Sequence, residues 1–307
     1  KTALDAAKAH GCDGVIGFGG ESSMDTAKVI AALLAGEQSL EDIYGTDQVR
    51  AARAPLALVP TTAGTGSEVT SVAIITTEAD EKVAVVDNAL YPDIAILDPD
   101  LTVGLPRHVT AATGIDAMVH AIEAYTNKHK KNPLSDALAR EALRLLSGGL
   151  VQACGQPDNM AAREQMMLGA MLAGQAFANS PVGAVHGLAY PLGGIFHIPH
   201  GLSNSLMLAP VLAYNAPVAD HLYAELAQIV CPAQVKGTAS DDCEAFIAHL
   251  NTLIEATGVE QRLSQLGISH NDLPKLAEDA MKAQRVLQNN PREMTYDGAL
   301  ALYTEVL

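Results

Sequence analysis

The residues best suited to chemistry lie in two stretches that combine acid and imidazole side chains. Residues 113–125 read TGIDAMVHAIEAY and place Asp116 and His120 four positions apart. Apolar residues recur around them with a helical period, so an amphipathic helix would present the carboxylate and the imidazole on one face. Burying a carboxylate on such an apolar face is unfavourable unless it is paired. The pair therefore indicates one side of a site for a divalent metal ion.

The second stretch, residues 185–201, contains the histidines that would complete this site. It reads VHGLAYPLGGIFHIPHG and holds His186, His197 and His200. Residues that break helices should interrupt the segment and fold it back, which would bring the rings of His186 and His200 toward one point. His197 is expected to line the pocket or face solvent. The helix breakers are Pro191, Gly193, Gly194 and Pro199.

Three imidazoles and one carboxylate suit Fe(II), Zn(II), Ni(II) or Co(II), and the ligand set alone does not choose among them. From spacing alone, a metal site and a set of hydrogen-bonded core histidines are equally open interpretations. Tyr190 follows His186 by four positions and would share its helix face. Its hydroxyl could bind a substrate oxygen, or its ring could simply form a pocket wall.

A glycine-rich turn near the beginning of the chain predicts an anion site. Residues 14–18 form a short apolar run typical of a buried parallel strand, and a helical pattern follows. Such a turn places unpaired N–H groups and the positive end of a helix dipole against a ligand, and glycine lets phosphate oxygens approach the backbone. The alternative is a tight connection without function. The candidate contacts are Gly19, Gly20, Ser22 and Asp25.

A second loop, rich in hydroxyl side chains, follows the next apolar strand. The strand covers residues 55–59, and the loop offers Thr61, Thr62 and Thr65. Ligands of doubly wound sheets bind outside the carboxyl ends of the strands, so these groups could hold a pyrophosphate or a nicotinamide carboxamide. A Ser/Thr turn that caps its own backbone is the alternative. Lys82 could reach a ribose or phosphate, or remain a solvated lysine.

The sequence pattern of the chain changes near residue 105. Before it, apolar runs predict an α/β unit, and after it alanine-, leucine- and methionine-rich helical patterns dominate. We predict a nucleotide-binding α/β domain over residues 1–105 and a helical metal-binding domain over residues 106–307, with a cleft between them. Within the first domain the pattern predicts a helix over residues 1–10, strands over 69–77 and 82–86, a polar turn over 79–82 and a final buried strand over 94–97.

Composition narrows the class of protein. Of 307 residues, 49% are hydrophobic and 18% charged, as in ordinary globular proteins, and the formal net charge is -16. That charge disfavours wrapping of a nucleic acid backbone. Four scattered cysteines form no zinc motif or disulfide framework, so we expect a cytoplasmic protein. No apolar run is long enough to predict a membrane span.

Taken together, these stretches resemble the iron-containing (group III) alcohol dehydrogenases, the family of lactaldehyde reductase and 1,3-propanediol dehydrogenase. The similarity keeps the family's order and extends over nearly the whole chain. The matching segments are GGESSMDTAK (19–28), PTTAGTGSEVT (60–70), ATGIDAMVHAIEAY (112–125), residues 185–201 and the closing Asn290-Pro291-Arg292.

The resemblance implies a Rossmann-like N-terminal domain and an all-helical metal-binding domain. It implies reversible hydride transfer between a small alcohol and NAD or NADP, with Fe(II) favoured over Zn(II) as the metal. Tyr190 and His200 become the candidate catalytic residues. The implied metal ligands are Asp116, His120, His186 and His200, and the implied cofactor contacts are Gly19, Gly20, Ser22, Asp25, Thr61, Thr62, Thr65 and Lys82.

Three features depart from the family pattern. Glu21 replaces the third glycine of the phosphate turn, and because a carboxylate repels a pyrophosphate, we expect its side chain to point outward. Tyr190 stands where many members carry a histidine linked to proton relay, and its high reference pKa makes it a poorer shuttle. The sequence opens at Lys1, whereas the resemblance leads us to expect an opening segment with the first nucleotide-binding strands before it.

Two other functions share parts of this pattern. A metal- and NAD-dependent lyase of the dehydroquinate synthase type would have the same two domains, but it binds a phosphorylated acid and needs more basic residues than the metal-binding helices offer. An inactive structural paralogue would bind neither metal nor cofactor. For the dehydrogenase we expect a small alcohol or aldehyde as substrate, no nucleic acid or membrane partner, and a homo-oligomer, a dimer or larger.

Overall fold

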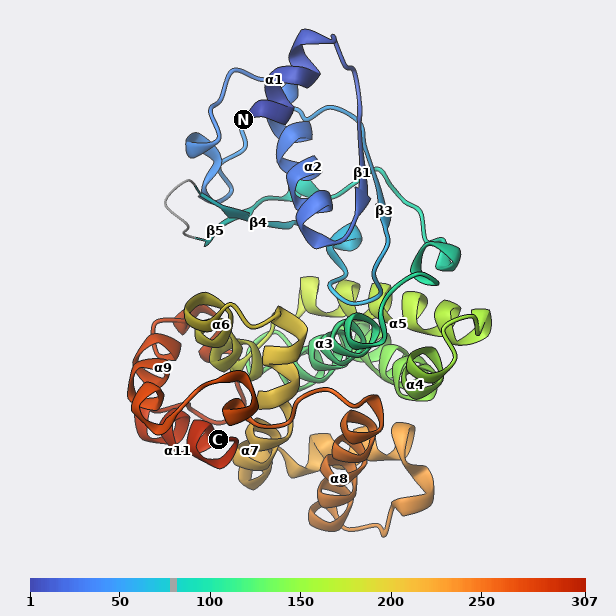
Figure 1. Ribbon diagram of the computed structural model, residues 1–307, viewed down its shortest axis with the longest axis vertical. Helices are drawn as coiled ribbons and strands as arrows, with labels where there is room; N and C mark the ends of the chain where they lie inside the picture. Colours follow the sequence, from blue (N-terminus) through green and yellow to red (C-terminus); the bar gives the residue numbers. More distant parts are fainter. Residues whose placement is uncertain (78–81) are drawn as a thin grey trace.

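The computed structural model describes residues 1–77 and 82–307, so part of the predicted polar turn over residues 79–82 lies outside the described residues. Figure 1 shows a smaller α/β part above a larger helical part. The C-terminal ends of strands β1 and β3 and the N-terminal end of helix α2 point toward the helices. In the described residues no helix is long and apolar enough to cross a membrane.

Three of the strands that the apolar runs predict form one parallel sheet on one side of the α/β part. Its strand order is β1-β3-β6, with Val15 opposite Leu56 and Ala57 opposite Ile94. Each of the three strands of this sheet appears within one or two residues of its expected position. The elements are α1 (Thr2–Ala9), β1 (Val15–Gly19), α2 (Glu21–Leu34), β3 (Leu56–Pro60) and β6 (Ile94–Ala95).

A second small sheet packs on the other side of α2. It has the order β2-β5-β4, formed by Gly45–Thr46, Lys82–Val86 and Val72–Thr76. Lys28 of α2 is fully buried, and its Nζ atom donates to Thr70 Oγ1 at 3.1 Å and to the Val72 carbonyl at 2.7 Å. These bonds replace water around the buried ammonium group, so α2 is attached firmly to β4.

The prediction that residues 14–18 form a buried strand was wrong for one face of the sheet, and the prediction that residues 94–97 form one was wrong for both faces, since none of these four residues is buried. Ile16 and Phe18 are 73% and 59% exposed, and Ile94 and Ile96 are 57% and 48% exposed. Leu56 and Leu58 face α2 and are buried. The reason is that, among the described residues, α2 covers only one face of this sheet, whereas the apolar pattern of parallel strands reflects two covered faces.

The helical part contains a single large hydrophobic core that includes the apolar faces of α3 and α5. Helix α3 extends the helix predicted around residues 113–125 at both ends. The elements are α3 (Arg107–Thr126), α4 (Pro133–Gly155), α5 (Met160–Asn179), α6 (Ala184–Phe196), α7 (His200–Val230), α8 (Ala239–Thr257), α9 (Leu273–Ala280), α10 (Gln284–Leu287) and α11 (Tyr296–Glu305).

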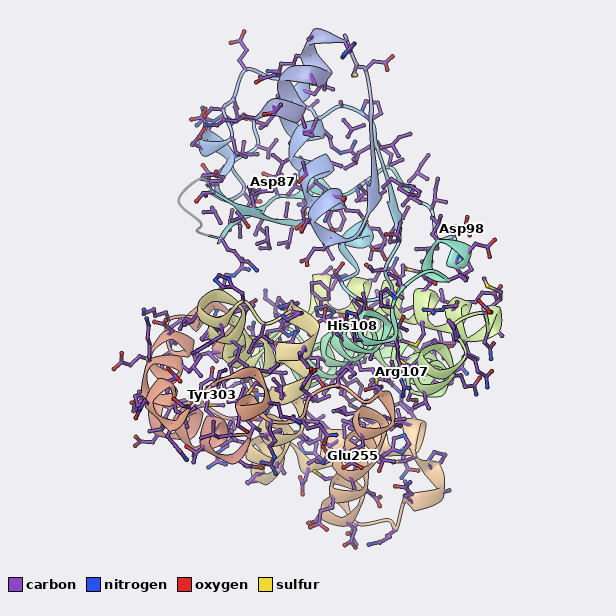
Figure 2. The ribbon with its side chains drawn as sticks, in the orientation of Figure 1. Asp87, Asp98, Arg107, His108, Glu255 and Tyr303 are labelled. Atoms are coloured by element: carbon purple, nitrogen blue, oxygen red, sulfur yellow. The ribbon has the colours of Figure 1, made fainter. Side chains whose placement is uncertain are left out.

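Long-range hydrogen bonds hold the ends of these helices together. Arg107, at the start of α3, donates from Nε to the Thr257 carbonyl at 3.1 Å and thereby binds the end of α8 (Figure 2). Tyr303 of α11 donates its buried hydroxyl to the carbonyl of Leu188 in α6. Each bond satisfies a carbonyl near the core, so α6 and α8 are positioned by side chains more than 100 residues away.

The break between α6 and α7 does not lie where the sequence predicted it. Pro191, Gly193 and Gly194 were expected to interrupt the helix, but α6 continues through all three. The chain turns instead at His197, which adopts a left-handed conformation with φ of 56°, and Pro199 is the N-cap of α7. Pro191 is tolerated because neighbouring helices can support a helix that has lost one hydrogen bond.

Close backbone contacts, possible only with glycine, join the two parts. A Cβ atom on Gly64 would lie 2.6 Å from Thr113 Cβ on α3, and one on Gly66 would lie 2.5 Å from the Gly174 Cα atom on α5. At the start of α7, a Cβ on Gly201 would lie 2.2 Å from the Ala112 carbonyl oxygen of α3. The hydroxyl-rich loop and α7 therefore both pack directly against α3.

The contact of Gly201 with α3 can be tested by substitution. Gly201→Ala should lower the free energy of unfolding by about 3 kcal/mol, the upper range for overpacking, because backbone must move. It should also weaken metal binding, since His200 moves with α7. Gly194→Ala is the matched control: its Cβ meets nothing within 4 Å, so it should be neutral or stabilising. Chemical denaturation measures both, and equal effects would contradict this account.

Candidate metal and nucleotide site

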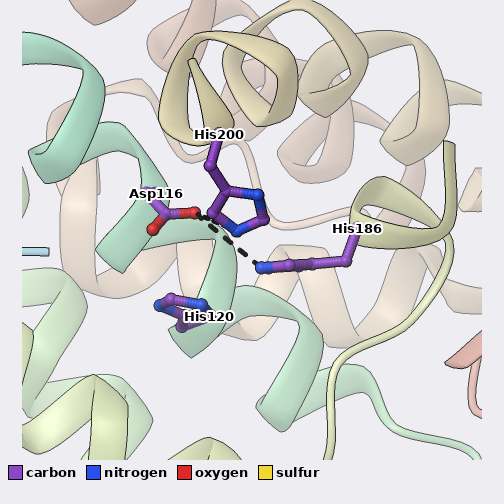
Figure 3. Close-up of side chains that lie close together, drawn as sticks. All are labelled: Asp116, His120, His186 and His200. Carbon is purple, nitrogen blue, oxygen red and sulfur yellow. Dashed lines mark ion pairs between the residues drawn. The ribbon is translucent and has the colours of Figure 1, made fainter. Parts of the chain in front are cut away.

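Four side chains from three helices converge below the α/β part. Asp116 and His120 come from α3, His186 from α6 and His200 from α7, and one ligand atom of each lies within 4.8 Å of all the others. Figure 3 shows the carboxylate and the imidazoles turned toward one point. Asp116 Oδ1 lies 3.6 Å from His200 Nε2 and 3.8 Å from His186 Nε2.

Burial controls the protonation of this cluster. Desolvation lowers the pKa of His120 to about 3 and also lowers the pKa of His200, so both rings are neutral at pH 7. Burial opposes the charge of Asp116 as well, but the surrounding imidazoles and an amide donor bring its pKa below the usual value. The carboxylate is therefore ionised and these rings offer lone pairs, which is the state that metal ligands require.

A buried acid, Glu123, supports His186 from behind. Its Oε2 atom lies 2.6 Å from His186 Nδ1, and its Oε1 atom accepts a hydrogen bond from the Val185 N–H, also at 2.6 Å. This carboxylate fixes the ring so that Nε2 faces the cluster. Although burial acts to lower it, the pKa of His186 is raised, mainly by Glu123. The sequence analysis missed Glu123, although it lies three residues after His120 on the same helix face.

The side chains present fit a metal ion. The buried Nδ1 atom of His120 has no hydrogen-bond partner among the described residues, and the ring stacks on Phe177 with centroids 4.4 Å apart. An unsatisfied buried nitrogen is unfavourable, and a cation is one partner that would satisfy it. A carboxylate oxygen with three imidazole nitrogens is also a common ligand set for first-row divalent metals.

Tyr190 and His197, the other candidate residues of the stretch 185–201, differ in their position relative to the metal-binding group. Tyr190 lies beside the cluster, with its ring centroid 6.4 Å from those of His186 and His200. Desolvation raises the pKa of Tyr190 to about 12, although 43% of its surface still touches solvent. His197 is exposed and does not belong to the metal-binding group. Of the two, only Tyr190 borders the site.

The glycine-rich turn and the hydroxyl-rich loop lie next to each other, as their strands predicted. The Thr61 N–H donates to the Gly19 carbonyl at 2.9 Å, and a Cβ on Gly20 would be 3.8 Å from the Thr62 side chain. Gly19 has φ of 143°, where a side chain would meet Ser23, so this position requires glycine. Ser22 is exposed in the first turn of α2. An anion could bind at this helix end.

Two of the other predicted cofactor contacts, Asp25 and Thr65, already form hydrogen bonds within the protein. Asp25 is buried, and its two carboxylate oxygens accept bonds from Ser67 Oγ at 2.6 Å and from the Ile74 N–H at 2.7 Å. Thr65 Oγ1 accepts from the Ser67 N–H at 3.3 Å, the self-capping arrangement. Lys82 is exposed at the start of β5. Direct contact of these three with a cofactor stays a prediction.

The expectation that Glu21 points outward was wrong. Its side chain is only partly exposed, and burial followed by the charges of Asp25 and Asp116 raises its pKa to about 7. The positive charges of Lys82 and Lys28 act in the opposite direction. Because Asp116 belongs to α3 and Lys82 to β5, Glu21 interacts electrostatically with both parts of the molecule.

Comparisons with known proteins agree with this architecture. The family described as "Iron-containing alcohol dehydrogenase" matches residues 1–99, and "Fe-containing alcohol dehydrogenase family, C-terminal" matches residues 110–307. A sulfoacetaldehyde reductase of Bilophila wadsworthia is 40% identical over 97% of this chain and 78% of its own length. A 1,3-propanediol dehydrogenase of Klebsiella pneumoniae is 36% identical over 96% of this chain and 76% of its own.

Solved structures show the same fold. A crystal structure of a 1,3-propanediol oxidoreductase matches this chain with a TM-score of 0.96 and 35% sequence identity. The match covers 100% of this chain and 80% of the oxidoreductase chain. A sulfoacetaldehyde reductase of Bifidobacterium kashiwanohense, in complex with NAD+, has a TM-score of 0.90 and 30% identity over 99% of this chain and 79% of its own. The chain belongs to the iron-containing alcohol dehydrogenase family, and it is a metal-dependent oxidoreductase of alcohols and aldehydes.

Proposed function

We propose that the protein transfers hydride between a small alcohol and NAD, with Fe(II) held by Asp116, His120, His186 and His200. The convergence of one carboxylate and three imidazoles in a buried cluster is the observation that supports this most strongly. NAD is favoured over NADP because a structural relative contains NAD+. We further propose a cytoplasmic homo-oligomer and two domains, residues 1–105 and 106–307.

In this function the protein supplies position and charge. When bound, the metal polarises the substrate oxygen as a Lewis acid and the nicotinamide accepts or returns the hydride. Asp116 offers the charged ligand, and Glu123 fixes the His186 ring through Nδ1. Lone pairs on neutral rings remain available because burial depresses the pKa of His120 and His200. No strong base on the protein is needed at the carbon.

Tyr190 is proposed to orient the substrate. Its ring borders the rings of His186 and His200, so a molecule near the cluster is within its reach. A pKa of about 12 keeps the phenol protonated at neutral pH, and it therefore acts as a hydrogen-bond donor to the substrate oxygen. The proton that leaves the alcohol then passes to water or to a cofactor hydroxyl.

The cofactor is proposed to lie across the two neighbouring loops. Its pyrophosphate meets the first turn of α2 at Gly19, Gly20 and Ser22, where no side chain caps the helix and backbone N–H groups could bind an anion. Thr61 and Thr62 border the same turn and offer hydroxyl groups. The nicotinamide end points toward the helical part, because the C-terminal ends of β1 and β3 face it (Figure 1).

Glu21 favours an uncharged substrate over an anionic one. Its carboxyl group interacts with the charge of Asp116, so an anion beside the metal cluster would meet two acidic side chains. We therefore propose a short neutral alcohol or aldehyde. Steady-state assays should give a higher kcat/KM for propanal than for sulfoacetaldehyde, and the reverse preference would contradict the proposed substrate class.

The metal assignment is tested by removing one ligand. His200→Ala should lose the metal and reduce kcat/KM by about 10³-fold or more, because a Lewis acid supplies several kcal/mol to the transition state. Elemental analysis of anaerobically purified protein and an assay of short alcohols with NAD measure the two effects. His197→Asn is the control, since His197 is exposed and asparagine tolerates its positive φ. A fully active His200→Ala protein would refute the assignment.

The support given by Glu123 predicts a second effect on the metal. Glu123→Gln keeps the size of the side chain but removes the charge beside His186 Nδ1. We expect metal affinity to fall about 10- to 100-fold, the usual loss when such a supporting group is changed. Competition with a chelator of known affinity measures it. Glu141→Gln, which breaks only an exposed pair with Arg144, should bind metal like the unchanged protein.

Glu21 predicts a pH dependence of cofactor binding. Its pKa is raised to about 7, so the carboxyl group is neutral below that pH and charged above it. Because an ionised Glu21 repels the pyrophosphate, the Kd for NAD should rise as the pH increases from 6 to 8. Glu21→Gln should remove this rise and bind NAD at pH 8 as tightly as at pH 6. Calorimetry measures both, and a pH-independent Kd in the unchanged protein would contradict the prediction.

A further inference from the structure

Asn204 lies among the metal ligands, although the sequence analysis did not single it out. It follows His200 by four residues on α7 and is fully buried. Its Nδ2 atom lies 2.6 Å from Asp116 Oδ1 and 3.2 Å from the Nε2 atoms of both His186 and His200. The amide nitrogen therefore contacts three of the four groups whose lone pairs converge in the cluster.

These contacts compete with a metal ion. An amide NH2 group has two hydrogens, and each would use a lone pair that a cation also requires. A divalent metal lies about 2.0 to 2.2 Å from imidazole nitrogen and carboxylate oxygen, inside the distances that Nδ2 keeps. An N–H bond to an imidazole Nε2 and a metal bond to the same atom exclude each other. Metal binding must therefore turn these hydrogens away.

The amide oxygen of Asn204 can exchange places with the amide nitrogen. Asn204 Oδ1 is buried and has no hydrogen-bond partner among the described residues, so only the ligand atoms fix the present orientation. A half-turn about the bond between Cβ and Cγ exchanges Nδ2 with Oδ1 and leaves the shape of the side chain almost unchanged. The partial negative charge of the oxygen would then face the cation, where the partial positive charge of the N–H groups would be repelled.

We propose that Asn204 is a fifth group of the metal site and that its amide turns when metal binds. Without a cation, Nδ2 donates to the converging ligands and offsets their mutual repulsion. With a cation, Oδ1 faces it and adds an oxygen donor to the Asp116 carboxylate and the imidazoles. An added oxygen favours Fe(II), Co(II) or Mn(II), which accept more than four ligands, over four-coordinate Zn(II). The inference rests on the metal site of the proposed function.

Co(II) binding to the full chain tests the role of the oxygen. Asn204→Ala removes it, and we expect Co(II) affinity to fall about 10- to 100-fold. If the amide served only as a donor in the metal-free protein, its removal would free the ligand lone pairs, and affinity would stay equal or rise. An equal or higher affinity therefore overturns the proposal. Ser205→Ala, which removes a buried hydroxyl without a partner from the same turn of α7, is the matched control.

The Asn204→Asp variant still tests the proposal if the alanine variant does not fold. It retains an oxygen at the same place, loses the N–H donor and adds a negative charge. We expect Co(II) affinity at least equal to that of the unchanged protein, together with a lower Tm before metal is added, because Asp116 would face a second carboxylate. A tenfold or greater loss of affinity would show that the N–H groups are what matters, against the proposal.

The same titrations separate this inference from the proposed function. If the unchanged protein does not bind Co(II), the metal site itself is wrong and both ideas fail. If the unchanged protein binds Co(II) and the Asn204→Ala variant binds it equally well, only the role of Asn204 is wrong. Visible absorption of the bound Co(II) gives a second readout, since loss of a fifth ligand shifts the site toward the more intense spectrum of tetrahedral geometry.

Discussion

The carboxylate of Asp116, buried among imidazoles, is the constraint on which the rest of this structure depends. Only 2% of Asp116 is exposed, and a charge at such a depth is unfavourable unless other groups compensate it. The neutral rings of His120 and His200 turn lone pairs toward the same point, and these lone pairs repel one another. The amide N–H groups of Asn204 relieve part of this repulsion. A divalent cation would relieve all of it and so stabilise the folded protein as well as activate a substrate.

Helix α3 links this cluster to the nucleotide half. The helix carries Asp116 and His120, and it also receives two of the three close glycine contacts, from Gly64 in the hydroxyl-rich loop and from Gly201 at the start of α7. The loop proposed to meet the cofactor is therefore in direct contact with the helix that holds two ligands. Hydride transfer needs such a fixed distance between its two partners.

The spacing of residues along the chain predicted much of this arrangement. Such predictions failed where the structure depends on contacts with residues far away in the sequence. The four-residue interval between Asp116 and His120 is a property of any helix, so their shared face could be predicted from sequence. Whether Pro191 breaks a helix depends on the neighbours that support it, and those neighbours lie far away in the sequence. Glu123 was missed because its partner, His186, is on another helix, so no interval within the chain reveals their contact.

Exposure was also predicted poorly, for the same reason. The apolar pattern around Ile16 is typical of a strand covered on both faces, but the pattern cannot say which element covers which face. Glu21 shows the opposite error. A carboxylate at a phosphate turn suggested repulsion and hence an outward side chain, because the argument considered one ligand and one residue. The structure places the side chain where Asp116 and Lys82 also act on it. Its position follows from packing of the two parts, which no local pattern contains.

The charges of the cleft connect its two binding sites. Asp116 and Glu123 are two buried acidic side chains, and a divalent cation beside them would offset negative charge in the cluster. Glu21 adds a third acid, and its raised pKa of about 7 reflects burial first and repulsion from Asp25 and Asp116 second. A cation beside Asp116 weakens that repulsion and so favours ionised Glu21, whereas the phosphates of a cofactor favour its neutral form. In the proposed site, a metal ion and a cofactor would therefore act on the same proton in opposite directions, and Glu21 would couple the two halves electrostatically.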